Sequence, residues 1–360
     1  MSGTKKTILA LIAVIIGIAA IAAGIAVGAA GHFLGKMERL DDSKIDKIAP
    51  EDEFFETDVP YAPPAPKKPA AENAEPVETD LAVTEAPETM PEGANVIEPE
   101  DVVWSDPHDP GVDTSMLINL MLVGQDRREG QMRQRSDTMI LVSINPQTKQ
   151  IAMISFLRDL YVQIPGGYSD NRLNVAYAFG GFPLLSEAMY VNFGVRIDGF
   201  FEVDFERFVD VIDAVGGVDI TLTEAEVKYV SDTVVGLNHL DGKQALSYAR
   251  IRKTDSDFGR SARQRNLLTS VLNKARKMNL TELYSLANAV FPALATDMSN
   301  TQIVSLMSKC LPMISSCELK SYRVPANDAY QPAWVRGMAV LLPDLEKARD
   351  SIFNEYLPLG

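Results

Sequence analysis

Three nearly unbroken apolar runs, at residues 116–123, 138–144 and 151–156, stand out from the pattern of hydrophobic and polar positions. The turn-forming residues 145–148 separate the second run from the third. Apolar runs of this length predict strands that are buried on both faces. Solvent and ligands then reach only the ends of these strands, so we look for chemistry there.

Beyond residue 170 the apolar spacing becomes helical, with shorter strand-like runs between the helices. Glycine pairs at 180–181 and 216–217 are typical of helix ends, and Asp241 suits a helix N-cap. The pattern predicts helices at 171–179, 183–193, 205–215, 241–250 and from 257 or 261 to 277, and strands at 200–203 and 218–222. This alternation predicts an α/β fold, a three-layer α-β-α sandwich, in one domain over residues 114–360.

The N-terminus contains a candidate membrane span. Residues 7–34 include no Asp, Glu, Lys or Arg, and 28 helical residues at about 1.5 Å each exceed a hydrocarbon core of roughly 30 Å. A cleaved signal peptide is the alternative, but its apolar region is shorter, about 7 to 15 residues. We therefore expect residues 1–35 to be a cytoplasmic tip and a transmembrane signal anchor. Lys5 and Lys6 place the N-terminus in the cytoplasm and the rest outside the cell membrane.

Residues 36–113 are acidic and rich in proline. Between Glu51 and Asp113 there are 18 acidic residues, 2 basic residues and 11 prolines. Such a segment cannot bury a core, which predicts a disordered stalk. It also accounts for the formal net charge of −15, so the remaining chain is close to neutral.

Several functional classes are disfavoured. The three histidines are scattered and stand near no candidate nucleophile, and no P-loop occurs, so Ser-His or Cys-His catalysis, a zinc site and a nucleoside triphosphate are not expected. No nucleic-acid partner is expected either. Cys310 and Cys317 lack a metal-ligand spacing, and the sequence leaves open whether they form a disulfide or two free thiols.

Charged residues gather at the strand ends and in one later region. Asp126 and Arg158 follow predicted strands, and Asp137 precedes one. A second group contains Arg250, Arg252, Asp257, Arg260, Arg263 and Gln264. Any one of these is more often a solvated ion pair. Their joint occurrence in a near-neutral domain favours a magnesium ion and an anionic, phosphate-like ligand.

These residues form an ordered series of motifs. The series is Asp126-Arg127-Arg128, Arg135-Ser136-Asp137-Thr138, Leu157-Arg158-Asp159, Gly216-Gly217-Val218, Leu240-Asp241-Gly242 with Ala245-Leu246, Arg250 with Arg252, and Gly259-Arg260 with Arg263-Gln264. Over about residues 115–275 the series resembles the LytR-CpsA-Psr family of membrane-anchored cell-wall glycopolymer ligases. One departure is Leu157, where the family has proline.

The resemblance implies a magnesium-dependent transferase. It would move an anionic glycopolymer from a polyprenyl-pyrophosphate carrier to a peptidoglycan hydroxyl, forming a phosphodiester and releasing polyprenyl phosphate. In this reading Asp126 and Asp137 bind Mg²⁺, Gln264 orients a phosphate oxygen, and Asp126 or Asp257 is the general base. The phosphates are gripped by Arg158, Arg250, Arg252 and Arg260, with Arg128, Arg135 and Arg263 as further substrate contacts.

Two alternatives remain at this point. The domain could be a non-catalytic lipid-pyrophosphate-binding regulator of the cell envelope, or a hydrolase that uses water as the acceptor. The sequence also leaves open which glycopolymer is moved and the oligomeric state.

Overall fold

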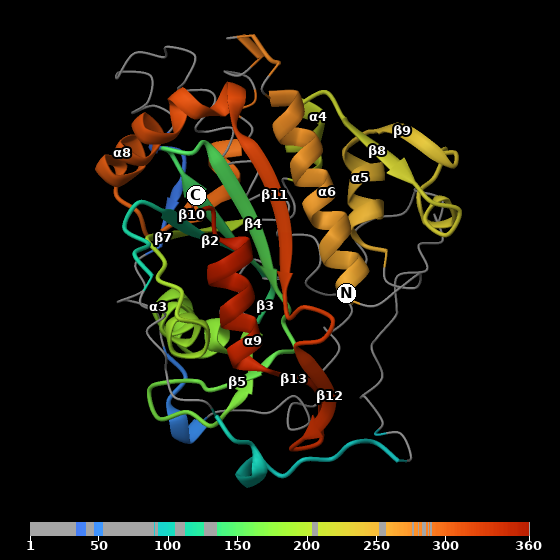
Figure 1. Cartoon of the computed structure of the whole chain (residues 1–360). Helices are drawn as coiled ribbons and strands as arrows, with labels where there is room; N and C mark the ends of the chain where they lie inside the picture. The colour runs from blue at the N-terminus through green and yellow to red at the C-terminus, as the bar shows by residue number, and fades with distance from the viewer. Residues whose placement is uncertain are drawn as a thin grey trace, which may run out of the picture.

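A seven-stranded mixed sheet forms the centre of the computed structural model (Figure 1). The structure describes residues 34–40, 47–52, 90, 93–104, 112–125, 135–203, 208–251, 257–275, 277–279, 281–282, 286, 288 and 290–359. The strand order is β1-β10-β7-β2-β3-β4-β11. The bounds are β1 (Glu38–Arg39), β10 (Leu294–Thr296), β7 (Gly199–Val203), β2 (Ile118–Gln125), β3 (Ser136–Asn145), β4 (Gln150–Phe156) and β11 (Glu318–Val324).

Four strands of this sheet run in the same direction. β7 is parallel to β2, β11 is parallel to β4, and β3 is antiparallel to both β2 and β4. The carboxyl ends of β7, β2, β4 and β11 therefore meet the start of β3 along one edge, which we call the rim. The three apolar runs predicted as strands are confirmed as β2, β3 and β4.

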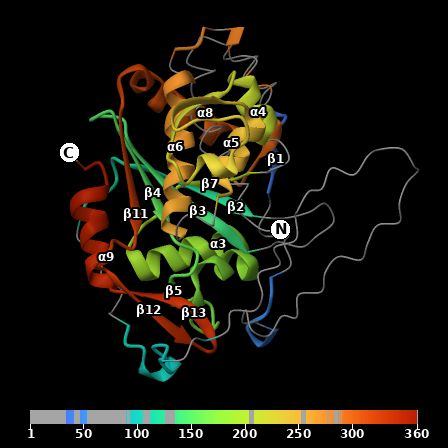
Figure 2. The same ribbon diagram turned by 90° about the vertical axis from the view of Figure 1, so that its right-hand side faces the viewer.

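Helices cover both faces of the sheet (Figure 2). Along β4, Met153 packs into one core and Ile154 into the other, as alternation in a strand requires. One face carries α3 (Leu173–Phe193) and α9 (Leu345–Ser351); the other carries α4 (Phe208–Ala214), α5 (Gly242–Ala249), α6 (Asp257–Ala275) and α8 (Asn300–Cys310). The predicted α/β class is confirmed.

Helix α3 replaces the two helices predicted around the first glycine pair. It is interrupted by a kink, since Gly181 has φ 70° and ψ −155°, and Pro183 follows inside the helix. Gly194 ends it in the left-handed conformation at φ 71°. The break predicted at 180–181 is therefore present, but as a kink within one element.

The side of the sheet that carries α4, α5 and α6 also carries a hairpin of β8 (Val218–Leu222) and β9 (Gly236–Leu240). Gly217 ends α4, its N–H donating to the Ile212 carbonyl at 2.8 Å. Asp241 caps α5 as predicted, in a capping box with Gln244. A side chain at Gly242 would place its Cβ 2.4 Å from the Val209 carbonyl oxygen, so this glycine allows α5 to pack against α4.

Parts of the predicted stalk belong to the folded domain, which corrects that prediction. β1 pairs with β10 in the central sheet. Trp104 stacks on Tyr161 with ring centroids 6.0 Å apart, and its Nε1 donates to Asp170 Oδ2 at 2.6 Å. Apolar residues scattered through the acidic segment are the physical reason, because they can be buried while their charged neighbours stay in water. The remainder of residues 41–92 and 105–111 lies mostly outside the described residues.

The predicted membrane anchor, residues 1–35, also lies outside the described residues, apart from Leu34 and Gly35. Leu34 is buried in the core, 3% exposed. Within the part of the chain that the structure describes, no helix is long and apolar enough to cross a bilayer.

The two cysteines are not joined by a disulfide bond. Cys310 and Cys317 are both buried free thiols. Burial raises the pKa of the Cys310 thiol to about 12.

Two small two-stranded sheets lie near α3 and α9. β5 (Tyr161–Val162) pairs with β6 (Asn171–Arg172), and β12 (Tyr330–Val335) pairs with β13 (Met338–Pro343).

Candidate active site

The rim contains a β-bulge at Asp137. Gly124 of β2 lies opposite Thr138 of β3, but the next residue, Gln125, lies opposite Ser136. Asp137 is therefore the extra residue of the bulge, a feature common beside active sites. Asp126 follows Gln125 and lies outside the described residues, as does the side chain of Asp137.

The end of β4 supplies a short chain of alternating charges. Arg158 Nε lies 3.4 Å from Asp159 Oδ2, and Arg172 Nη1 lies 3.7 Å from Asp159 Oδ1. Arg172 is 4% exposed and also donates to the Ala339 carbonyl. Arg158 thus lies at the rim, as expected from its place after a strand. The carboxylate of Asp159 is shared between the guanidinium groups of Arg158 and Arg172.

The first turns of α6 reach the same rim. The guanidinium carbon of Arg323, the penultimate residue of β11, lies 4.1 Å from the ring centre of Phe258, the second residue of α6. Two residues further on, Arg260 is buried at 4% exposure, and one turn later Gln264 is 1% exposed. The Nε2 atom of Gln264 is buried without a hydrogen-bond partner among the described residues.

Arg250 is the second polar side chain at this place with an unmatched group. It is the C-cap of α5, and its Nη2 atom is buried with no hydrogen-bond partner in the described part of the chain. Burial lowers the pKa of Arg250 to about 10. Arg250 as a whole is half-buried, and an unpaired buried group on a cation is costly, which suits a site that binds an anion.

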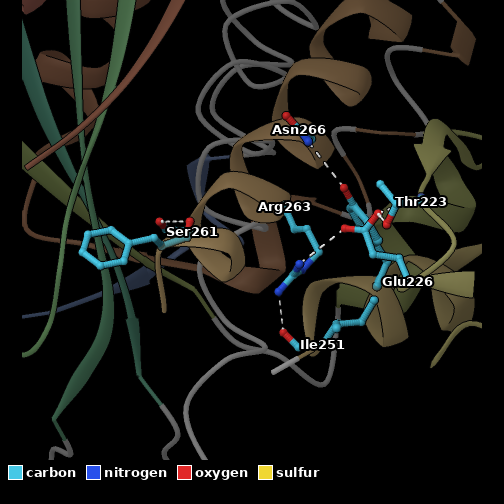
Figure 3. Close-up of polar contacts among 8 residues, drawn as sticks. Thr223, Glu226, Ile251, Ser261, Arg263 and Asn266 are labelled. Atoms are coloured by element: carbon cyan, nitrogen blue, oxygen red, sulfur yellow. Dashed lines mark hydrogen bonds and ion pairs between the residues drawn. The ribbon is translucent and has the colours of Figure 1, made fainter. Parts of the chain in front are cut away.

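Arg263 has a different role from its neighbours on the helix (Figure 3). Its Nη1 lies 3.3 Å from Glu226 Oε1, and its Nη2 donates to the Ile251 carbonyl at 2.7 Å. Ile251 directly follows Arg250, so Arg263 fixes the backbone that carries Arg250. Arg263 and Gln264 lie three and four residues after Arg260, which suggested one shared face, but the Arg263 guanidinium group turns toward Glu226. Its substrate-binding role remains a prediction, and the geometry favours a bracing role.

The other predicted site residues are only partly described. Arg135 immediately precedes β3 and is half-buried. Asp257 starts α6, but nothing is described of its side chain. Arg128 and Arg252 lie outside the described residues. The structure thus places Arg158 just after β4, Arg250 at the end of α5, and Arg260 and Gln264 on the first turns of α6, and the roles of all these residues stay predictions.

The prediction of a magnesium site rests only on the positions of Asp126 and Asp137 in the chain. The described residues contain no group of three potential ligands among His, Cys, Asp and Glu. The bulge nevertheless places Asp137 at the β2–β3 end from which the chain continues to Asp126. Two carboxylates suit Mg²⁺, which typically takes one or two from the protein and keeps several waters.

Several polar residues at the rim were not predicted. Thr138 is 4% exposed, and its Oγ1 has no hydrogen-bond partner among the described residues. Arg265 and Arg323 lie on the α6 side of β4 and β11. Arg265 could have been suspected from its place beside Gln264, whereas no sequence signal distinguishes Arg323 from a surface arginine.

A separate groove of about 1010 Å³ lies along the later turns of α6. Its lining includes Asn266, Ser270, Asn273 and Lys277, and Thr221 of β8. This groove is distinct from the rim, because its residues on α6 start beyond Gln264.

The comparisons with known proteins agree with this architecture. The model of the LytR_cpsA_psr family matches residues 93–352. The chain belongs to the LytR-CpsA-Psr family. The match begins inside the segment predicted to be a stalk, consistent with the packing of Trp104.

Relatives of known name in this family include two proteins called polyisoprenyl-teichoic acid--peptidoglycan teichoic acid transferase TagU. The one from Oceanobacillus iheyensis is 38% identical over 200 residues, which are 53% of this chain and 62% of that protein. The one from Bacillus anthracis is 31% identical over 254 residues, which are 69% of this chain and 76% of that protein.

Solved structures of the family share the fold. B. subtilis TagV matches at 28% identity with a TM-score of 0.52, covering 68% of this chain and 98% of that one. TagT bound to LI-WTA matches at 25% identity with a TM-score of 0.54, covering 69% and 95%.

Proposed function

We propose that this protein transfers an anionic glycopolymer from a polyprenyl-pyrophosphate carrier to a hydroxyl group of peptidoglycan. The observation that carries the proposal is the unmatched polar pair at the rim, Arg250 and Gln264, beside Arg260 and Arg158. Buried donors without acceptors fit a ligand that brings acceptor oxygens, and a diphosphate is rich in them. The names of the TagU relatives support teichoic acid as the polymer class and peptidoglycan as the acceptor.

The position of the site supports the same reading. In open α/β sheets, ligands bind outside the carboxyl ends of the strands. Here four such ends meet the start of β3 and the first turns of α6. The ion pair between Arg263 and Glu226 holds the segment after Arg250 in place. The guanidinium group of Arg250 is therefore positioned before a substrate arrives. Preorganised positive charge is the main demand of phosphoryl transfer.

The reaction breaks the bond between the bridging oxygen of the pyrophosphate and the phosphorus atom that carries the sugar. The acceptor oxygen forms a new bond to this phosphorus, and polyprenyl phosphate leaves. Arg158, Arg250 and Arg260 bind the phosphate oxygens and stabilise the charge that moves to the leaving group. The acceptor proton passes to a carboxylate, Asp126 or Asp257. Mg²⁺ held by Asp126 and Asp137 would neutralise phosphate charge when it is bound.

The proposed location follows from the N-terminal sequence. Residues 1–35 anchor the chain in the cell membrane with the N-terminus in the cytoplasm, and the catalytic domain lies outside. There the domain meets both a lipid-linked donor and the cell wall.

A transfer assay tests this function. Full-length protein in detergent is given a labelled polyprenyl-pyrophosphate glycan, with and without peptidoglycan, in Mg²⁺ or in EDTA. We expect Mg²⁺-dependent release of polyprenyl phosphate and label on peptidoglycan. Release that is equally fast without peptidoglycan would identify a hydrolase, and binding without release would identify a regulator.

The variants Arg158→Ala and Arg250→Gln should each lower turnover by about ten- to a hundredfold, because a hydrogen bond to a charged group is worth about 1.5–3 kcal/mol. Arg196→Gln is the control. Arg196 stacks on the exposed ring of Tyr190 at 4.6 Å, near the opposite end of the sheet, where β7 begins. Wild-type turnover in Arg250→Gln would contradict the proposed function.

A further inference from the structure

Arg265 is a buried cation whose side-chain partners are neutral. It follows Gln264 on α6, is 8% exposed and faces the sheet. Its Nε donates to Ser321 Oγ at 2.5 Å, and its Nη1 donates to Ser155 Oγ at 2.7 Å. Hydroxyl groups satisfy the geometry of a guanidinium group but do not balance its charge. Burial of a charge without a counter-charge is costly, so this position is unfavourable in the absence of a ligand.

Arg323 lies beside it, and its contacts within the described residues are also with neutral groups. Its Cα partner in the sheet is Ser155, the residue that Arg265 contacts. Its guanidinium group stacks on Phe258 at 4.1 Å and donates to the side-chain oxygen of Asn327. Its Nη1 atom is buried and has no hydrogen-bond partner among the described residues. Arg323 is otherwise half-buried, so a ligand can reach it from solvent.

The two cations act on one another. Burial lowers the pKa of Arg265 to about 10, and the charge of Arg323 adds to this lowering. In the part of the chain that the structure describes, no carboxylate forms an ion pair with either residue. Two guanidinium groups at one place, with two hydroxyl groups bound to one of them, are the composition of a site for a tetrahedral oxyanion.

This pair stands apart from the Arg250 site. Arg323 belongs to β11, the last strand of the sheet order, whereas the bulge at Asp137 belongs to β3, two strands away. The ring of Phe258 fixes the plane of the Arg323 guanidinium, and Tyr330 supports that ring at a centroid distance of 5.4 Å. A ligand bound at the middle of the rim must extend toward the edge of the sheet to meet Arg323 (Figure 1).

We propose that Arg265, Arg323, Ser155 and Ser321 form a second oxyanion site, which binds a phosphate group of the glycopolymer's own repeating unit. The identity of this ligand rests on the proposed function, but the preference for an oxyanion does not. The site selects donors by the charge of their polymer, while the Arg250 site holds the pyrophosphate common to all of them.

A titration tests the oxyanion site without any donor. Full-length protein in detergent is saturated with inorganic pyrophosphate in Mg²⁺-free buffer and then titrated with inorganic phosphate in a calorimeter. Wild-type protein should bind phosphate. Arg323→Gln should weaken this binding about tenfold or more, since a charge-assisted contact is lost. Arg323→Lys should keep part of it because the charge remains.

Lys320→Gln is the matched control, because Lys320 is an exposed cation on the same strand, its side chain 42% exposed. It should bind phosphate as the wild type does. Wild-type protein that binds no phosphate under these conditions, or an equal loss in Lys320→Gln, would overturn the second site. Thermal melts confirm that each variant is folded, and Arg265→Lys provides a second variant that retains charge in the core.

A donor comparison identifies the ligand. One donor carries a phosphate-containing polymer, and the other carries a single uncharged sugar on the same lipid pyrophosphate. Arg323→Gln should raise KM about tenfold for the first donor, with kcat unchanged, and should leave both constants unchanged for the second. Equal losses on both donors would mean that Arg323 serves the pyrophosphate, which overturns the inference. If the wild type turned over neither donor, the proposed function would fail, and the phosphate titration would still decide the oxyanion site.

Discussion

The ion pair between Arg263 and Glu226 gives the sharpest test of how the site is built. Their side chains are only 3% and 10% exposed. Glu226 also accepts hydrogen bonds from the backbone N–H and the hydroxyl group of Thr223, at 3.0 and 2.9 Å. Glu226→Gln keeps an acceptor for Thr223 but removes the charge that matches Arg263. The guanidinium group then loses its contact with the Glu226 carboxylate, while its hydrogen bond to the Ile251 carbonyl remains.

The expected cost follows from this geometry. Removal of one partner of a buried ion pair costs about 3–5 kcal/mol. Because the Thr223 contacts survive in Glu226→Gln, we expect the lower end, about 3 kcal/mol. For a domain of this size each kcal/mol lowers Tm by roughly 2–4 °C, which gives about 6–12 °C. Turnover should also fall, since the backbone beside Arg250 loses its brace.

Thermal unfolding followed by circular dichroism in phosphate-free buffer measures this shift. Glu318→Gln is the control, because Glu318 makes an exposed pair with Lys320 at 3.8 Å, and such pairs contribute about 1 kcal/mol or less. The double variant Glu226→Gln/Arg263→Met should recover part of the lost stability, because no unpaired charge remains. A Tm change in Glu226→Gln no larger than in Glu318→Gln would refute the bracing role.

Three further predictions concern other parts of the fold. Gly217→Ala should cost about 2 kcal/mol more of the free energy of unfolding than Gly216→Ala in urea denaturation. Both glycines have positive φ, but only a Cβ at Gly217 would meet a backbone oxygen, that of Leu240 at 2.8 Å. Equal losses in the two variants would contradict this. The pKa of Cys310 is about 12 in the folded protein against 9.0 for an ordinary thiol, so the Cys310 thiol loses its proton at a lower pH in the unfolded chain than in the folded protein. The free energy of unfolding should therefore fall between pH 9 and 12 by up to about 1.4 kcal/mol per pH unit. Cys310→Ala should remove that fall in chemical denaturation at pH 8.5–10.5, and parallel curves for the two proteins would argue against it. Trp104→Phe removes the 2.6 Å hydrogen bond to Asp170 and should lower stability by about 1–2 kcal/mol at pH 7. Burial raises the pKa of Asp170, and this loss should shrink as the pH falls through that pKa; a loss independent of pH would show that the bond is not to a carboxylate.

The strands of the rim could be predicted because each is an apolar run bounded by turn residues. β2, β3 and β4 begin and end within two residues of the predicted runs. The glycine pair 216–217 and the cap at Asp241 were equally predictable, since each satisfies a local backbone requirement.

The directions of the arginine side chains could not be predicted. Helical spacing places Arg260 and Arg263 on one face, but Glu226, 37 residues earlier, draws Arg263 away. Arg323 occupies a strand with mixed exposure, and its place beside Ser155 depends on the pairing of β11 with β4, which no local pattern fixes. The acidic composition of the segment was also misleading for residues 93–104, where three acidic residues and one proline concealed the few apolar contacts that hold this segment on the domain, such as Trp104 on Tyr161.

The central claim is that positively charged side chains at the rim, Arg250 above all, bind a diphosphate. Calorimetric titration of a short-chain polyprenyl diphosphate into full-length protein, with thermal melts without ligand, tests it most directly. Arg250→Gln should weaken binding at least about tenfold, and its Tm without ligand should stay equal or rise, because a half-buried charge with an unmatched nitrogen is removed. Arg196→Gln should change neither quantity. Wild-type affinity in Arg250→Gln, or a fall of several degrees in its Tm without ligand, would contradict the account.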